Sequence, residues 1–296
     1  MELDNPSNAL VVQQLEELRK KNRKYEFFVL GSMILVIIQP FLANYAHLKT
    51  LSIILSILGM CGILFCVAVM VDNKKVFQNL YKNTFLVGML EDYFTDVVCQ
   101  WKTGFDKDFV EELGIIQKGN RFHSEDYIKA VYNGVHFEQS DVEIEKETGS
   151  GKNHRVVTYF GGRMFEFNFP KTDYKSVMVF SKKFPYMGEG TEPRYEEVKL
   201  EGTEFNKKFK VLAANAHDGF YILTPQVMEC LEKVLDKYDN VALHYIEGKL
   251  YVAINMKTNA FEGDMYKKIV YEKELEKIKY DIEVICDIID ALDLSE

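Results

Sequence analysis

The segment LSIILSILGMCGILFCVAVMV, residues 51–71, decides the architecture of this chain because it holds no charged residue. A helix needs about 20 apolar residues to cross the hydrocarbon core of a bilayer, and this segment meets that length. We therefore predict a membrane-spanning helix over residues 51–71.

A second apolar segment, residues 27–46, lies just before the first. It carries Pro40 near its C-terminal end, where a membrane helix tolerates a proline close to the interface. Residues 47–50 are too few for anything but a tight turn. The two segments together predict a transmembrane helical hairpin over residues 27–71, preceded by a basic helix over residues 1–26.

Positive charge flanks the hairpin on the side of both chain termini. The turn between the spans holds only Lys49. The positive-inside rule places basic flanks in the cytoplasm, so we expect a protein of the cell (inner) membrane with two spans and both termini cytoplasmic. A signal peptide is the alternative for the first span, but the following apolar segment and the lack of an Ala-x-Ala cleavage motif favour a span. The flanking bases are Arg19, Lys20, Lys21, Arg23, Lys24, Lys74, Lys75 and Lys82.

Small residues recur every three or four positions on the second span. Small side chains at this spacing allow another helix to approach closely. We favour the first span of the same chain as that helix, and a second copy of the chain is the alternative. The residues are Ser52, Ser56, Gly59, Gly62 and Cys66.

Charge and cysteine content narrow the class of protein. The chain has 296 residues and a formal net charge of -9, and its acidic excess lies after residue 71. An acidic domain lacks the basic surface expected of a nucleic-acid binder. Five scattered cysteines without a C-x-x-C pair predict free thiols in a reducing compartment.

The sequence after residue 71 predicts an α+β fold. We expect a cytosolic domain of mostly antiparallel sheet with flanking helices and a long C-terminal helix. We expect a helical connector over residues 72–134, in which Ser124 caps a short helix beginning at His123. The cytosolic domain then covers residues 135–296. Its expected strands are residues 135–147, 155–169, 176–181, 194–200, 205–213, 241–246 and 249–255, and Thr224-Pro225 starts a helix.

The last predicted helix, residues 264–292, has the most regular apolar pattern in the chain. Its apolar residues step alternately by four and three over three heptads. Val284 and Ile288 widen the stripe, which favours packing onto a domain core. A seam between copies of the chain is the alternative, and it would contain Leu275, Ile278, Ile282, Ile285 and Ile289.

Four segments follow one another behind the two predicted spans, namely GIIQKGNRFHSEDYIKAVYNGVHFEQSDVEIE, FGGRMFEFNFPK, EFNKKFKVLAANAHDGFYILTPQVMECLEKV and GKLYVAI. In sequence and in order they resemble the DUF3137 family of bacterial membrane proteins. The resemblance covers about residues 75–290. It implies a bacterial cytoplasmic-membrane protein with a cytosolic α+β domain, and it transfers no catalytic residue because the family's function is unknown.

Motifs for catalysis and cofactor binding are missing from the sequence. It contains no P-loop, G-x-G-x-x-G, H-E-x-x-H or G-x-S-x-G, and its six histidines never fall at ligand spacing. We therefore expect no cofactor, no metal site and no catalytic residue. Asp141, Glu143 and Glu145 alternate on one strand, where a solvated edge is favoured over a cation site.

The loop of residues 182–193 is the predicted partner-binding element. It carries Phe184, Tyr186 and Met187, and partner contacts often lie on loops with exposed apolar side chains. In the alternative arrangement, Phe184 and Tyr186 fold back onto the sheet.

The preferred function is a membrane-anchored cytosolic binding or scaffold protein that recognises a protein or peptide and is not an enzyme. Its partners would be the lipid bilayer, a protein and, through the terminal helices, further copies of the chain, but not nucleic acid. The first alternative is a membrane-anchored enzyme whose site is built from dispersed acids such as Asp141 or Glu166. The second is a membrane-perturbing effector.

Overall fold

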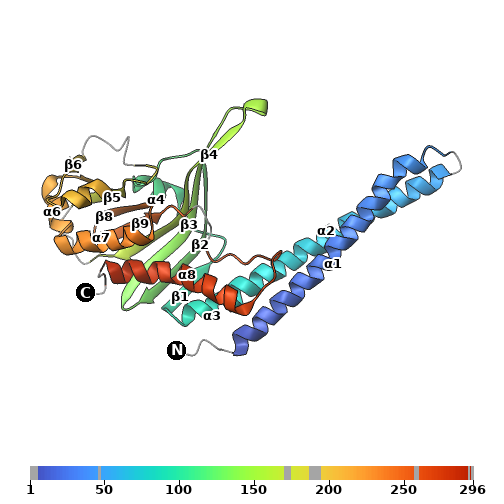
Figure 1. Cartoon of the computed structure of the whole chain (residues 1–296), viewed down its shortest axis with the longest axis horizontal. Coiled ribbons are helices and arrows are strands. Elements are labelled where there is room, and N and C mark those ends of the chain that lie inside the picture. Colours follow the sequence, from blue (N-terminus) through green and yellow to red (C-terminus); the bar gives the residue numbers. More distant parts are fainter. Residues whose placement is uncertain are drawn as a thin grey trace. The chain divides into compact units, whose positions relative to one another are not determined.

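The computed structural model describes residues 6–45, 48–169, 175–186, 195–256, 260–292 and 294. The chain divides into two compact units, which are drawn together in Figure 1. The first contains Met1–Met89 and Gly263–Ile278, and the second contains Leu90–Glu262 and Lys279–Glu296.

Two long antiparallel helices dominate the first unit. They are α1 (Pro6–Leu42) and α2 (Lys49–Leu80), and α2 continues through a π-helix, η2 (Tyr81–Leu86), into α3 (Val87–Glu91). The basic segment and the first span, expected as separate elements, form one helix because no glycine or proline interrupts residues 7–26.

The small residues of α2 face α1 of the same chain. A Cβ added to Gly59 would lie 2.8 Å from the carbonyl oxygen of Ser32, and one added to Gly62 would lie 2.6 Å from the Ser32 hydroxyl. Ser52 and Cys66 are also buried. The predicted packing of the first span on this stripe is confirmed.

A nine-stranded sheet forms the centre of the second unit, with the strand order β1-β2-β3-β4-β9-β8-β5-β7-β6 and antiparallel pairing throughout. The strands are β1 (Thr95–Gln100), β2 (Arg121–Tyr132), β3 (Val135–Thr148), β4 (Arg155–Asn168), β5 (Ser176–Ser181), β6 (Glu196–Val198), β7 (Phe209–Ala213), β8 (Val241–Ile246) and β9 (Lys249–Ile254). The helices that accompany them are α4 (Lys107–Glu112), η3 (Gly151–Asn153), α5 (Thr203–Lys208), α6 (Ala216–Ile222), α7 (Pro225–Lys237) and α8 (Tyr271–Ala291).

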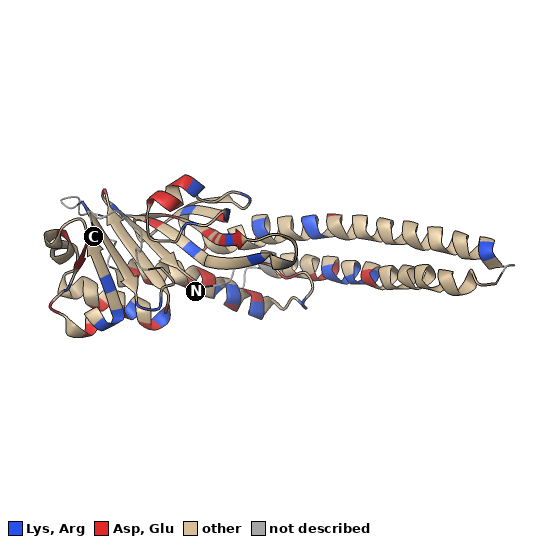
Figure 2. Cartoon of the chain, turned by 90° about the horizontal axis from the view of Figure 1, so that it is seen from above, with Lys and Arg blue, Asp and Glu red and all other residues tan. Residues whose placement is uncertain are grey.

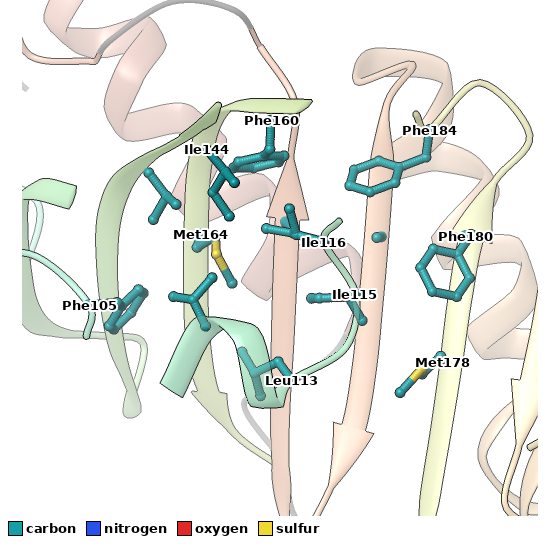
Figure 3. Packing of buried hydrophobic residues seen from close by; sticks show 14 of the residues in the cluster. Phe105, Leu113, Ile115, Ile116, Ile144, Phe160, Met164, Met178, Phe180 and Phe184 are labelled. Atoms are coloured by element: carbon teal, nitrogen blue, oxygen red, sulfur yellow. The ribbon is translucent and has the colours of Figure 1, made fainter. Parts of the chain in front are cut away.

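The two faces of the sheet follow from its register, because paired residues in neighbouring strands point to the same side. Met164, Ala253, Ala242 and Phe180 form one row across β4, β9, β8 and β5. This row belongs to the apolar cluster covered by α4 and the segment after it, so we name this side the α4 face. Figure 3 shows Ile115 and Ile116 of that segment among Phe160, Met164 and Phe180.

The opposite side of the sheet is covered by α7 and by the second-unit part of α8, as Figure 1 shows, and we name it the helical face. Phe165 and Phe167 lie on it and are fully buried. They alternate with Met164 and Glu166, which point to the α4 face. The aromatic side chains of Phe165 and Phe167 therefore belong to the core.

The predicted helical connector over residues 72–134 is wrong beyond Glu91. Its last part forms β1, α4 and β2, and β2 pairs with β3 along most of its length. The expected helix at His123 is β2, because Ile128 and Ala130 alternate as buried residues and Ser124 donates to the carbonyl oxygen of Asp141 instead of capping a helix. Pairing with β3 has outweighed the local capping signal.

The predicted strand over residues 205–213 is wrong in its first part, because residues 205–208 belong to α5 and only Phe209–Ala213 form β7. Several other predicted elements are confirmed. β3 and β4 form the expected hairpin, and all six residues of β5 are buried between β7 and β8. The turn between β8 and β9 has positive φ at Glu247 and Gly248, as a two-residue hairpin requires. The hydroxyl of Thr224 accepts a hydrogen bond from the backbone N–H of Val227 and caps α7.

The last helix begins at Tyr271, seven residues later than expected. Its apolar stripe is buried within the chain, with Ile278, Ile282, Ile285 and Ile289 at 0% exposure. This is the core-packing arrangement. A seam between copies stays a prediction for Leu275, which is half-buried.

Candidate functional site

The helices α1 and α2 expose an unusually large apolar surface. Phe41 and Leu64 are each 68% exposed, and many other large apolar side chains of the two helices are exposed as well. Both helices are long and apolar enough to cross a membrane, with windows of mean hydropathy 1.8 and 2.8. Figure 2 shows the long uncharged part of both helices in tan. Apolar surface of this extent is typical of contact with lipid, so the hairpin supports membrane association.

A polar pocket of about 330 Å³ lies on the α4 face of the second unit. We name it the charged pocket. Its walls come from β2, β3, β4 and β9, which places its side chains on hydrogen-bonded strands rather than on loops. It is lined by Lys129, His136, Phe137, Glu138, Glu166, Asn168 and Lys249.

Two ion pairs organise the charged pocket. Lys129 Nζ lies 2.8 Å from Glu138 Oε1, and Lys249 Nζ lies 2.8 Å from Glu166 Oε1. Lys249 Nζ also donates to Asn168 Oδ1 at 2.8 Å. The register places Glu138 opposite both Lys129 and Glu166, so the two pairs lie side by side.

The carboxylate of Glu138 stays ionised. Burial opposes its ionisation, yet hydrogen bonds from Lys129 and Tyr127 outweigh burial and hold the pKa of Glu138 below its usual value. The same pairing raises the pKa of Lys129. The pocket therefore presents an ionised Lys129–Glu138 pair.

A buried arginine lies on the helical face of the sheet. Arg163 has 0% exposure and lies between the rings of Phe165 and Phe261, whose centroids are 5.1 and 5.0 Å from its guanidinium carbon. Its Nη1 donates to the carbonyl oxygen of Asp281 in α8 at 2.6 Å, and its Nε and Nη2 donate to Gln139. Arg163 therefore ties α8 to the sheet.

Two carboxylates accompany Arg163. Asp141 Oδ2 accepts from the backbone N–H of Ala260 at 2.7 Å, and Asp281 Oδ2 accepts from that of Phe261 at 2.9 Å. Burial raises the pKa of Asp141 to about 7, against the opposing charge of Arg163. This cluster fastens residues 260–261 over the helical face, which gives it a structural role.

The predicted acidic edge at β3 is wrong, because β3 pairs with β2 on one side and with β4 on the other, and its acidic face is only partly solvated. Glu143 is exposed and Glu145 forms an ion pair with Arg121, but Asp141 is buried. Within the described residues, no three His, Cys, Asp or Glu side chains lie close enough together to hold a metal ion.

The two acids of the enzyme alternative do not share a site. Asp141 pairs in register with Arg163 on the helical face, whereas Glu166 lines the charged pocket on the α4 face. The sheet separates the two carboxylates.

A buried serine and histidine form a second polar contact on the α4 face. Ser176 Oγ lies 2.6 Å from His244 Nε2 and 3.0 Å from the hydroxyl of Tyr195. Burial lowers the pKa of His244 to about 4. A histidine so reluctant to take a proton is a poor general base, and Ser176 is buried, so this contact stabilises the sheet.

The predicted partner-binding loop folds back onto the sheet where it is described. Phe184 is 3% exposed and lies in the core of the α4 face, and Tyr186 packs against that core beside Phe180. Met187 lies outside the described residues. A partner contact at this loop remains a prediction.

Sequence reasoning missed Arg163 and the charged pocket. The partners of Arg163 lie 24 and 118 residues away along the chain, so no local pattern indicates them. The alternation of Glu166 with Phe165 and Phe167 was a usable signal, because it places a carboxylate opposite a buried aromatic face.

Comparison with known proteins gives one family. Residues 158–294 match the DUF3137 family model. DUF3137 is described as a protein of unknown function, and the resemblance noted in the sequence is confirmed over this segment. The DUF3137 match begins within β4 and includes Glu166, Asn168 and Lys249 of the charged pocket, whereas Lys129, His136 and Glu138 precede it.

No curated protein matches the chain in sequence. The crystal structure of the mycobacterial trehalose monomycolate transport factor A, TtfA, is similar to this chain with a TM-score of 0.33 and 8% sequence identity. The similarity covers 66% of this chain and 88% of that chain. A likeness at this level assigns neither a fold nor a function to the DUF3137 segment.

Proposed function

We propose that this chain is a binding protein anchored in the cell membrane by α1 and α2, and that its charged pocket recognises a protein partner. The observation that carries the proposal is the pair of Lys–Glu contacts on neighbouring strands, Lys129 with Glu138 and Lys249 with Glu166. Because the side chains stand on a hydrogen-bonded sheet, they are held in place before a partner arrives, which lowers the entropy cost of binding.

The charges of the pocket favour a partner segment that carries both signs. Each lysine can exchange its own glutamate for an acidic side chain of the partner, and each released glutamate can accept a basic one. Such exchange gives specificity and orientation more than raw affinity. The acidic balance of the chain argues against nucleic acid as the partner.

Site-specific photo-crosslinking in growing cells tests the pocket. A photoreactive residue at His136, which is exposed at the pocket, should give one discrete adduct with a second protein. The matched control is His154, an exposed histidine outside the pocket, which should not give that adduct. The His136 adduct should be lost when Lys129→Glu and Lys249→Glu are combined. An adduct that forms equally at both histidines, or that survives the double charge reversal, would remove the pocket from the proposal.

The proposed orientation places both termini in the cytoplasm, on the basis of the basic residues beside both spans. Reporter fusions at the N-terminus and at the C-terminus of the full chain should both score as cytoplasmic. An external signal from either fusion would overturn this topology, but it would not bear on partner binding at the charged pocket.

A further inference from the structure

Among the described residues, β4 has a strand on both sides only over its second half. β4 pairs with β3 from Arg155 to Phe167, but with β9 only from Arg163 to Asn168. In the part of the chain that the structure describes, no strand lies against the outer side of residues 155–161. Figure 1 shows this part of the β3–β4 hairpin projecting from the sheet.

The hydrogen bonds of Asn120 identify the backbone groups that face outward. Asn120 Oδ1 accepts from the N–H of Glu147, its Nδ2 donates to the carbonyl of Glu147, and its backbone N–H donates to the carbonyl of Glu145. Glu145 and Glu147 therefore direct these groups away from β4. Their partners in register, Thr158 and Val156, must direct their own N–H and C=O groups away from β3, toward the free edge.

The side chains of this edge suit strand pairing. Val156 is 36% exposed and Val157 is 37% exposed, and Thr158 and Tyr159 continue the run of strand-forming residues. Native edge strands are usually blunted by proline or several charges, but this one carries only Arg155. A bulge at Tyr159, where the register shifts, limits the regular edge to four residues.

We propose that this edge of β4 pairs antiparallel with the same edge of a second copy of the chain, about a two-fold axis at Val157. In this register Val156 faces Thr158 of the second copy, and Thr158 faces Val156 of that copy. These four residues are the ones whose N–H and C=O groups point outward, so two hydrogen-bonded pairs form with four main-chain hydrogen bonds. Val157 faces its own counterpart in the non-hydrogen-bonded pair between them.

Three features favour a second copy as the occupant. The register is self-complementary, as a two-fold interface requires. The one charge, Arg155, lies opposite Tyr159 of the other copy, so no like charges meet. A membrane anchor confines copies to one surface, which raises their effective concentration for a contact only four residues long.

Disulfide crosslinking of the full chain in native membranes tests the register. In the proposed pairing the two Val157 Cα atoms lie about 4.5 Å apart, within the reach of a disulfide. The two Val156 Cα atoms are diagonal neighbours about 7–8 Å apart, beyond that reach. Under mild oxidation, Val157→Cys should give a disulfide-linked dimer, and Val156→Cys should give at least fivefold less. The wild type, with its five native cysteines, sets the background.

A proline variant separates edge pairing from random collision. The N–H of Val156 faces the free edge, so Val156→Pro removes a donor to the second copy without removing a donor to β3. Adding Val156→Pro to Val157→Cys should abolish the crosslink while the urea midpoint of the protein stays unchanged.

Four results would overturn the proposal. They are equal crosslinking at Val156→Cys and Val157→Cys, no dimer above the wild-type background, a crosslink unaffected by Val156→Pro, and a disulfide from Val157→Cys to a different protein. The last result would make an extended segment of that protein the occupant of the edge.

Discussion

The helices α2 and α8 both carry large apolar side chains, but these side chains are exposed on α2 and buried on α8. On α2, Ile53 is 55% exposed and Leu64 is 68% exposed. On α8, Ile282 and Ile285 are at 0%. Both helices contain several isoleucines, so the presence of this residue type alone does not separate them. The distribution of charge does, because residues 51–71 of α2 carry none, whereas α8 carries charged residues on the side opposite its apolar stripe.

The difference shows how the distribution of charged residues along a helix determines whether lipid or protein surrounds it. A helix that is apolar all round has no side that prefers water, so lipid or other helices must surround it. A helix with one apolar stripe needs a single covering surface, and for the part of α8 in the second unit that surface is the helical face of the sheet. Four predictions test this contrast, from the largest expected effect to the smallest.

The first prediction breaks the core side of α8. Combining Ile282→Asp with Ile289→Asp places two carboxylates at fully buried positions, which should lower the free energy of unfolding by more than about 5 kcal/mol. Urea unfolding of the full chain in detergent, followed by the fluorescence of its one tryptophan, Trp101, measures this. A folded variant with a reduced oligomeric state would instead assign the stripe to a seam between copies.

The second prediction removes the polar anchor of α8. Arg163→Met keeps an apolar stem between Phe165 and Phe261 but leaves the buried amide oxygen of Gln139 and the carbonyl oxygen of Asp281 without their donor. Removing one partner of a buried charge cluster costs about 3–5 kcal/mol, and the same urea titration reports it. The exposed Arg155→Met is the matched control and should leave the midpoint in place. Equal urea midpoints for Arg163→Met and Arg155→Met would show that Arg163 does not stabilise the packing of α8 on the sheet.

The third prediction acts on α2 alone. Leu64→Asp puts a charge near the middle of the uncharged segment, at a cost of about 3 kcal/mol for membrane insertion. The fraction of the chain that resists carbonate extraction should fall, while the second unit keeps its urea midpoint. Loss of the domain's stability with unchanged extraction would mean that Leu64 belongs to a soluble core.

The fourth prediction concerns pH and the cluster beside α8. The pKa of Asp141 is raised from 3.8 to about 7 in the folded chain, so the folded state holds a proton that the unfolded state has lost. This contribution is present below pH 4 and is lost as pH rises to about 7, with a slope of roughly 1 kcal/mol per pH unit.

Replacing Asp141 by Asn should remove this slope between pH 5 and pH 7, as measured by urea midpoints at several pH values. The neighbouring exposed Glu143→Gln is the control and should keep the slope of the wild type. If Asp141→Asn and the wild type lose stability in parallel, another group titrates in this range.

Local patterns located much of the fold. Thr224-Pro225 started α7, Glu247-Gly248 turned β8 into β9, and the heptads of α8 marked its buried side. These succeed because a cap, a two-residue turn and an apolar stripe are each specified by residues close in sequence. The prediction at His123 failed because the same residues that suit a helix start also suit a strand once β3 lies beside them.

The sequence by itself determined the uncharged spans, the close approach at Gly59 and the α+β character of the remainder, because these depend on composition and on neighbours three or four residues apart. Tertiary structure alone decided that Arg163 is buried with Gln139 and Asp281, and that Lys129 and Lys249 flank one pocket. It also decided which half of β4 keeps a free edge. Each of these depends on strand order, and strand order brings together residues that no local pattern along the chain connects.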